Sequence, residues 1–312
     1  MIGALAAWSM RRSSHLTLIF HRVLTARDPM SPGEPTAVWF DGLMSTLARR
    51  FEMIALDDAV QRAERGELHG RTLSVTFDDG YADNYEVALP ILQRHGVPAT
   101  FFIASGFLDG GRMWNDSIIE TCRVLAPGEH ESADADLGMI TLSDWNSRRQ
   151  AAARLIKAWK HLPLEQRHER VARFSALADS LPDNLMMRTD QLRDMAATPG
   201  VTIGGHTVSH PILAALPAEQ ARAEITAGKQ ALEDKLQREL TLFAYPNGKQ
   251  GPDYRVEHAQ MVRDAGFKAA VATDWGTLSN TTDHFQIPRF TPWNANLDRF
   301  CVDLARCHHG LL

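Results

Sequence analysis

The sequence predicts an α/β protein, a distorted (β/α) barrel of seven or eight mostly parallel strands that carries a long helical insertion. Three observations lead to this class. Short apolar runs rich in β-branched residues recur along the chain and alternate with helical patterns. The chain has 312 residues, 44% of them hydrophobic, which is enough for one large barrel. No internal repeat or low-complexity tract interrupts the alternation.

Residues 72–103 show the alternation most clearly. The apolar run at 73–77 predicts a buried parallel strand, and Asp-Asp-Gly (78–80) follows it. A helical pattern and a second apolar strand at 99–103 complete a βαβ unit. Its two adjacent carboxylates lie at the C-terminal tip of a strand, where parallel α/β folds bind ligands. Asp-Asp-Gly is also typical of a helix N-cap and turn, so the motif alone leaves that alternative open.

The other elements are predicted from the same two periodicities. Strands are expected at residues 16–20, 52–56, 201–204, 240–245, 267–272 and 285–290. Helices are expected at residues 39–50, 57–65, 218–238, 254–265 and 296–307. Asp57 and Asp58 are expected to cap the second of these helices rather than to form another acidic site.

The segment between residues 110 and 198 has a different character. It has no strand pattern, and helix-forming runs at 148–160 and 165–180 fill much of it. Because it is long for a connection between a strand and a helix, we expect a helical insertion over or beside the barrel mouth. The chain is therefore expected to be a single domain, 1–312. Its core would comprise about 16–110 and 199–312, with the insertion at 111–198.

Composition excludes several classes of protein. The formal net charge is −5 and no basic run occurs, which argues against a nucleic-acid partner. Three scattered cysteines indicate neither a disulfide framework nor a thiolate metal site. The sequence contains no run of eighteen apolar residues, so no transmembrane segment is predicted. Residues 1–12 are apolar before they are basic, the reverse of a signal peptide, so we expect a cytoplasmic protein. The sequence does not indicate an oligomeric state.

A metal site is predicted at the strand ends. His206 and His210 follow the strand at 201–204, and two imidazoles with one carboxylate form a common catalytic zinc set. Two adjacent carboxylates repel each other unless a cation binds one and leaves the other free as a base. A lone H-x-x-x-H is often structural or a chance occurrence. Here Asp78, Asp79 and His21 also follow predicted strands, which brings all five side chains to one face of a barrel.

At these positions the sequence resembles the polysaccharide deacetylase family, the NodB-homology domains of carbohydrate esterase family four. The motifs that carry the resemblance are TFDDG (76–80), HTVSH (206–210), FAYPNG (243–248), ALPIL (88–92) and GVPATFF (96–102). The third motif is similar to the variant that contains YPxG. The resemblance covers about residues 16–290, apart from the insertion.

The resemblance implies a role for each matching residue. Asp79, His206 and His210 would hold a divalent metal, usually zinc, and Asp78 would be the general base. The backbone N–H of Tyr245 would donate to the oxyanion. The implied reaction removes N-acetyl groups from an N-acetylated amino-sugar oligosaccharide, polysaccharide or glycoconjugate, for example one built of N-acetylglucosamine. No G-x-S-x-G motif suggests a covalent intermediate.

The sequence departs from the family pattern at two places. The commoner third motif has an arginine before its proline that steadies the base, and here Arg289 in IPRF (287–290) is expected to replace it. The usual late histidine, a general acid, is not evident. FHRV (20–23) resembles an N-terminal element of biofilm poly-N-acetylglucosamine deacetylases, so His21 is the expected acid. A purely structural hydrogen bond of His21 is the alternative.

Two other functions stay open from the sequence. The first is a metal-dependent hydrolase of a small non-sugar amide, such as a cyclic ureide, on the same fold. The second is a carbohydrate-binding relative without turnover, although the intact aspartates and histidines of the motifs argue against it.

Overall fold

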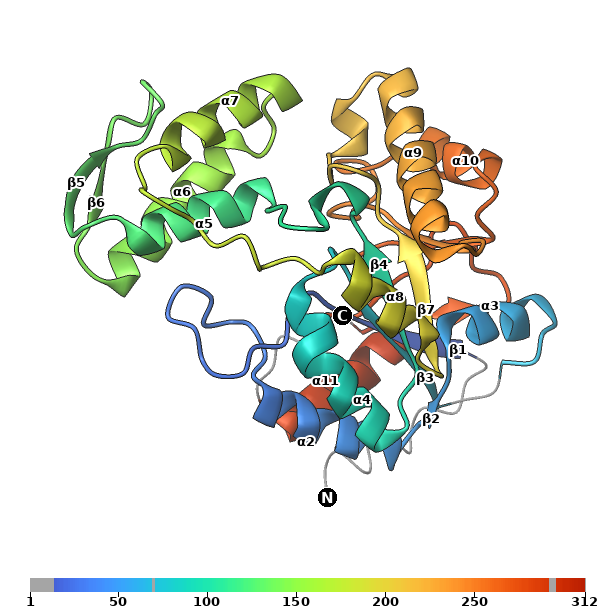
Figure 1. The fold of residues 1–312 in the computed structure, drawn as a ribbon. Coiled ribbons are helices and arrows are strands. Elements are labelled where there is room, and N and C mark those ends of the chain that lie inside the picture. The colour runs from blue at the N-terminus through green and yellow to red at the C-terminus, as the bar shows by residue number, and fades with distance from the viewer. Residues whose placement is uncertain (1–13, 69–70, 292–295, 312) are drawn as a thin grey trace.

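The computed structural model describes residues 14–68, 71–291 and 296–311 (Figure 1). Within these residues one sheet has the order β10–β1–β3–β4–β7–β8–β9, with β2 beside β3. Its strands are β1 (Ser14–Phe20), β2 (Glu52–Met53), β3 (Thr72–Phe77), β4 (Ala99–Ile103), β7 (Val201–Gly205), β8 (Leu242–Ala244), β9 (Ala269–Val271) and β10 (Leu278–Ser279). Its strand pairs are parallel except β1–β10. The predicted α/β class with a curved, mostly parallel sheet is confirmed.

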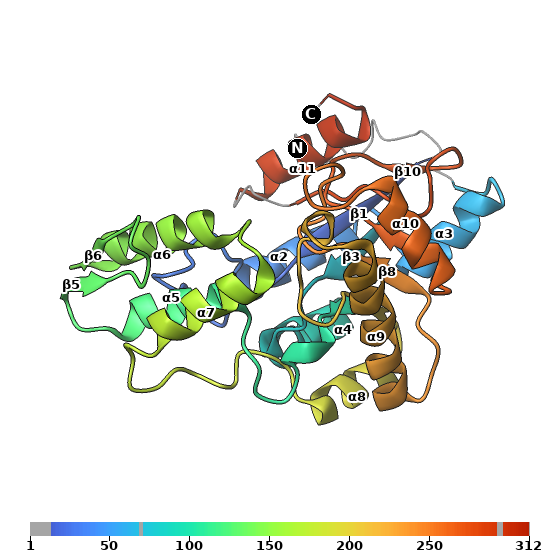
Figure 2. The same ribbon diagram turned by 90° about the horizontal axis from the view of Figure 1, so that it is seen from above.

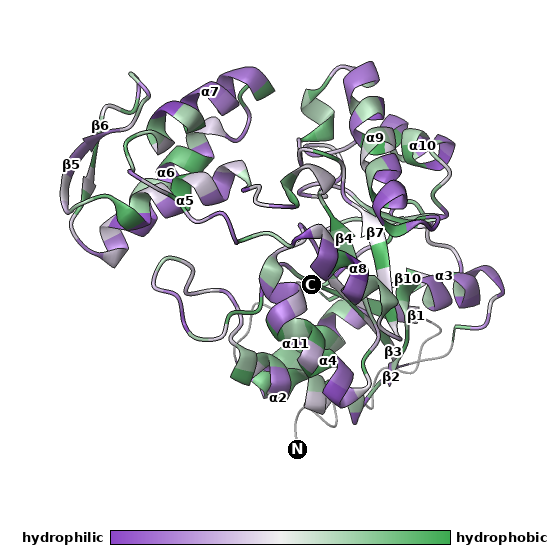
Figure 3. Ribbon diagram, viewed as in Figure 1, coloured by the Kyte–Doolittle hydropathy of each residue, from purple (hydrophilic) through white to green (hydrophobic). Residues whose placement is uncertain are grey.

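Helices surround the sheet. They are α2 (Ala37–Ala48), α3 (Leu56–Glu64), α4 (Leu89–His95), α8 (Thr189–Ala197), α9 (Ala218–Leu236), α10 (Val256–Asp264) and α11 (Leu297–His308), with short turns η1 (Asn84–Ala88), η2 (Ser105–Phe107) and η3 (Leu213–Ala215). Hydrophobic residues are prominent within β4 and β7, whereas α3 and α9 contain hydrophilic stretches (Figure 3). Asp57 and Asp58 do not cap α3, because Ala55 holds that position. They lie in its first turn, where negative charge favours the helix dipole.

The central strands end at a common level. Phe20 pairs with Phe77 and Phe77 with Phe101, with ring centroids 5.4 and 4.9 Å apart. All residues of β1, β3 and β4 are buried, as is typical of parallel strands covered on both faces. The pairing continues from Ile103 to Gly205 on β7. The residues that follow Phe20, Phe77 and Gly205 therefore meet at one edge of the sheet.

Residues 285–290 lie between β9 and β1 without forming a regular strand. The prediction of a strand there is wrong, because Ile287 and Phe290 form only isolated parallel bridges, with β9 and β1 respectively. Pro288 lies between them and has no N–H with which to extend a ladder. The segment still connects β9 to β1, and it carries Arg289 to the edge where the strands end.

The insertion projects to one side of the sheet and has its own hydrophobic core (Figures 1 and 2). It contains α5 (Trp114–Val124), α6 (Trp145–Trp159), α7 (Leu164–Ser175) and an antiparallel hairpin, β5 (Gly128–Glu131) with β6 (Met139–Leu142). The predicted helical insertion is present, but it also contains this hairpin, which the sequence did not indicate. Only four residues of β6 alternate between exposed and buried, and β5 is mostly exposed, so the strand signal was too short to recognise.

The insertion also ends earlier than predicted. Its core includes Trp159 and Phe174, whereas Leu192 and Met195 of α8 belong to the main core beneath the sheet. Helix α8 is thus part of the barrel, although the predicted insertion ran to residue 198. Arg123 of α5 forms a two-pronged ion pair with Asp28, 2.6 and 2.7 Å, which ties the insertion to the loop after β1.

Two predictions concern the ends and the membrane. The described helices include none with the length and hydropathy needed to cross a bilayer. The prediction of a cytoplasmic location was drawn partly from residues 1–12. These lie outside the described residues, so the location stays a prediction.

Candidate metal centre and catalytic site

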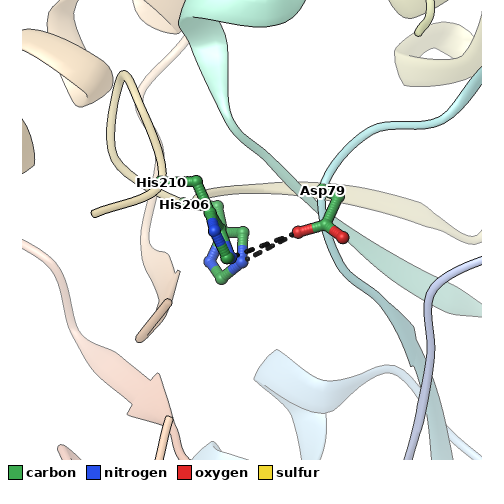
Figure 4. Close-up of side chains that lie close together, drawn as sticks. All are labelled: Asp79, His206 and His210. Carbon is green, nitrogen blue, oxygen red and sulfur yellow. Dashed lines mark ion pairs between the residues drawn. The ribbon is translucent and has the colours of Figure 1, made fainter. Parts of the chain in front are cut away.

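Asp79, His206 and His210 converge at the edge where the strands end (Figure 4). The Nε2 atoms of both histidines lie 3.4 Å from the same oxygen, Oδ1 of Asp79. All three donor atoms lie within 4.8 Å of one another. The sequence-predicted metal ligands are therefore brought together by β3 and by the loop after β7.

The three side chains fit a divalent metal. Asp79 Oδ1 is buried and has no hydrogen-bond partner, which is costly for a carboxylate oxygen. A separation of 3.4 Å is longer than an ordinary N–H···O hydrogen bond. It agrees with the ~3.3 Å expected between two donors that each lie ~2 Å from one tetrahedral ion. The ring of His206 is oriented to match, because Nδ1 donates to the Ala244 carbonyl at 2.7 Å and leaves the Nε2 lone pair facing Asp79.

The backbone around the ligands is unusual. Asp79 has φ = +78° and His210 has φ = +51°, both in the left-handed region that non-glycine residues seldom adopt. Such strain persists only where the surroundings impose it, and it is concentrated at functional sites. Gly80, with φ = +93°, completes the turn, and a Cβ there would lie 3.2 Å from the Ile103 side chain.

Helix α9 holds the histidine loop in place. Glu224 accepts hydrogen bonds from the N–H groups of Val208 and Ser209, both at 2.9 Å, and from the Ser209 hydroxyl at 2.6 Å. Gly228, one turn further along, approaches the backbone of Thr207 so closely that an added Cβ would lie 2.7 Å from it. Neither Glu224 nor Gly228 was singled out from the sequence. A glutamate and a glycine four residues apart on a helix do not indicate that a loop packs against them.

Asp78 is held by Arg289 in a buried, two-pronged ion pair. Nη1 and Nη2 of Arg289 lie 2.7 Å from Oδ1 and Oδ2 of Asp78, respectively. Arg289 is 0% exposed, and its Nε donates to the Ala272 carbonyl at 2.8 Å. The structure thus places Arg289 beside the carboxylate that it was expected to steady, and Asp78 stays outside the cluster of metal donors.

The electrostatics separate the roles of these side chains. Burial opposes ionisation of Asp78, but the charge of Arg289 outweighs it and lowers the pKa of that carboxyl. The pKa of Asp79 is also lowered, since the imidazoles of His210 and His206 outweigh its burial. Burial lowers the pKa of His210 to about 4. Burial would also lower the pKa of His206, but the facing carboxylates of Asp79 and Asp78 raise it. Both aspartates are therefore ionised at neutral pH.

His21 and Tyr245 differ in their relation to this site. His21 is exposed and lines the same cavity as Asp78, as expected for a residue that follows a neighbouring strand. Tyr245 is fully buried, and its hydroxyl donates to the Phe285 carbonyl. The Tyr245 backbone N–H donates to the Val271 carbonyl at 3.2 Å. An oxyanion role for this amide stays a prediction, and it requires the amide to release that carbonyl.

A cavity of about 240 Å³ opens over the aspartates and histidines. One side of it comes from the insertion, through Trp114, Lys160 and Arg167. Lys160 and Arg167 could not be singled out from the sequence, because they lie on or beside amphipathic helices with many other basic residues. The prediction that the insertion lies over or beside the barrel mouth is confirmed by these contacts.

The fold is similar to that of several solved structures. The chain superposes on the Streptococcus pyogenes deacetylase PplD with a TM-score of 0.59 and 16% identity, covering 89% of this chain and 92% of that one. It superposes on IcaB from Ammonifex degensii with a TM-score of 0.59 and 18% identity, covering 93% and 97%. It superposes on a de-N-acetylase from Aggregatibacter actinomycetemcomitans with a TM-score of 0.57 and 16% identity, covering 89% of this chain and 94% of that one. These likenesses establish the fold.

Sequence comparison gives the family. The family described as Polysaccharide deacetylase matches residues 65–133 and 156–270, more than half of the chain. The chain belongs to this family. Bacillus subtilis YxkH, whose name assigns it provisionally as a polysaccharide deacetylase, is 20% identical over 215 residues. The match covers 69% of this chain but 49% of YxkH, so the chain spans about half the length of that relative.

Proposed function

We propose that this protein is a metal-dependent N-deacetylase of an N-acetylated amino-sugar oligosaccharide, polysaccharide or glycoconjugate. One observation carries the proposal. An ionised carboxylate, Asp78, is fixed by Arg289 at the edge of a three-donor metal site and lies outside that site. With a metal ion bound, this arrangement would supply a base beside a Lewis acid, which hydrolysis of an unreactive amide requires.

Asp79, His206 and His210 would hold the metal. A divalent ion, in the first place zinc, supplies Lewis-acid activation of water and of the acetyl carbonyl when it is bound. Asp78 accepts the proton of the attacking water as the new C–O bond forms. Arg289 engages both of its oxygens, so the lone pair that takes the proton has a fixed direction.

The leaving amine needs a proton as the C–N bond breaks. His21 lines the same cavity and is open to solvent, which suits a general acid that can be reprotonated after each turnover. The resemblance of FHRV (20–23) to the biofilm deacetylase branch supports this assignment. Acetate and the free amino sugar are then the products, and no covalent enzyme intermediate is needed.

Release of acetate tests the proposal. The full chain is incubated with N-acetylglucosamine oligomers and with a panel of small non-sugar amides, before and after chelation and after zinc is added back. We expect acetate from the sugars, at least about 100-fold less after chelation, and recovery with zinc. Turnover that chelation leaves intact, or hydrolysis of small amides alone, would contradict the proposal.

A further inference from the structure

Arg167 of α7 is a buried arginine without a carboxylate partner. Its side chain lines the cavity over the candidate metal centre and is 3% exposed. The guanidinium lies 4.8 Å from the centre of the Trp114 ring. Its Nη1 reaches the Lys160 carbonyl at 3.4 Å, and its Nε and Nη2 are buried with no hydrogen-bond partner.

Other arginines of the insertion are paired. Arg148, 7% exposed, donates to the carbonyls of Cys122 and Leu125 at 2.5 and 2.8 Å. Arg123 is bound by the carboxylate of Asp28. Burying an arginine without such partners is unfavourable, and burial lowers the pKa of Arg167 with no acidic group to oppose it. A guanidinium nevertheless stays protonated near neutral pH, so the cavity holds an uncompensated positive charge.

Two walls of the cavity differ in charge. The barrel wall, made of Asp78, Asp79, His206 and His210, carries the catalytic carboxylates. The insertion wall, made of Trp114, Lys160 and Arg167, carries two cations, and no ion pair of Lys160 is present among the described residues. A substrate that spans the cavity would meet carboxylates and a metal at one end and unpaired cations at the other.

We infer that the insertion wall binds an anionic group of the substrate, a carboxylate or a phosphate, through Arg167 with Lys160 beside it. The inference rests on the proposed function for the acetamide end. The substrate class is then an N-acetylated amino sugar that carries a negative charge. Arg167 supplies paired N–H donors that match either anion, and Trp114 holds the guanidinium plane in place.

A structural role for Arg167 would explain fewer of these contacts. Stacking on Trp114 and a cation near the C-terminal end of α6 are both stabilising. The single hydrogen bond to the Lys160 carbonyl is long, and it leaves the other buried N–H groups unsatisfied. An anion in the cavity would satisfy them once the guanidinium turns toward it.

Binding is tested on the full chain after chelation, so that the probe cannot ligate a metal. Calorimetric titration compares glucose with glucose 1-phosphate and glucuronate, which carry the two anions without an acetamide. We expect at least one anionic sugar to bind about tenfold more tightly than glucose. Arg167→Gln should remove this preference and Arg167→Lys should keep part of it. Arg173→Gln, an exposed change on the same helix, should leave it intact.

Turnover separates this inference from the proposed function. Acetate release by the zinc-loaded enzyme is compared for N-acetylglucosamine, its 1-phosphate and N-acetylmuramic acid. We expect Arg167→Gln to raise KM for the anionic substrate about tenfold with little change for the neutral one. Equal binding of glucose and both anionic sugars, or no effect of Arg167→Gln, overturns the inference while deacetylation stands. Anion preference without acetate release from any sugar overturns the function and leaves the anion site.

Discussion

The barrel wall and the insertion wall of the cavity are built in opposite ways. On the barrel wall, Asp78, His206 and the histidine loop are each held by a partner from another element, and the buried Oδ1 of Asp79 faces the two histidines. Asp78 is bound by Arg289, His206 by the Ala244 carbonyl, and the loop between the histidines by Glu224. On the insertion wall, Arg167 has buried donors with no partner. The first wall therefore has fixed geometry before substrate arrives, whereas the second has unused binding capacity.

The difference separates chemistry from recognition. Pre-organised charges lower a barrier because they need not reorganise during the reaction. Unpaired groups cannot help in that way, but they gain most when a ligand supplies the missing partner. Substitutions on the barrel wall should therefore affect every substrate alike. Substitutions on the insertion wall should discriminate between substrates.

The largest effect is expected from Asp78→Asn. The amide keeps the shape of the side chain but cannot accept the proton, so kcat should fall about 1,000-fold or more for neutral and anionic sugars alike. Zinc should still bind, because Asp79, His206 and His210 are unchanged. Acetate release and zinc content measure the two properties, with the exposed Asp264→Asn as control. Near-normal turnover would remove Asp78 from the role of base.

Arg289→Gln should have the next largest effect. Loss of the cation leaves Asp78 buried without its ion pair, which should cost about 3–5 kcal/mol of unfolding free energy. The pKa of Asp78 should rise, because the Arg289 charge no longer opposes burial. We expect kcat to fall about 100-fold and the acid limb of the pH–rate profile to move to higher pH. An unchanged acid limb would show that Asp78 is not the group that titrates there.

Acidification should weaken zinc binding by about tenfold per pH unit below the pKa of His206. That pKa is raised above 6.5, so a proton must leave Nε2 before the metal binds. His210, with a pKa of about 4, stays neutral over this range and adds no second proton. Competition titrations between pH 8 and 5 should approach a slope of one at the acid end. A slope near two would mean that both histidines are protonated together.

The smallest effect is expected from Gly228→Ala. The new methyl group would press on the backbone of Thr207, so unfolding free energy should fall by about 1–3 kcal/mol and zinc affinity severalfold. Gly42→Ala is the matched control, because its methyl group would meet only a Leu297 side-chain atom at 3.7 Å. That change should be neutral or stabilising, as is usual for alanine in a helix. Thermal unfolding and zinc titration of both variants decide the point.

The chemistry at the strand ends was predictable from the amino-acid sequence. In a parallel sheet, strand ends share one edge, so runs of apolar residues followed by His21, Asp78 and His206 were enough to predict their meeting. Their spacing and the motif set indicated the family that the comparison then showed. The helical insertion was recognised from its length, but its hairpin and its last boundary were not, since four alternating residues are too weak a signal.

Most partners of the site residues became known from the three-dimensional structure. That Glu224 holds the histidine loop and that Arg167 is left unpaired depend on contacts between residues far apart in the chain. The contact of Arg289 with Asp78 is also a long-range one, but it was expected from the family resemblance. Local propensity and periodicity show which face of an element is buried, but not which side chain of another element it meets. The positive charge of the insertion wall could therefore not be predicted. A basic helix that faces solvent and a basic helix that lines a cavity have the same sequence pattern.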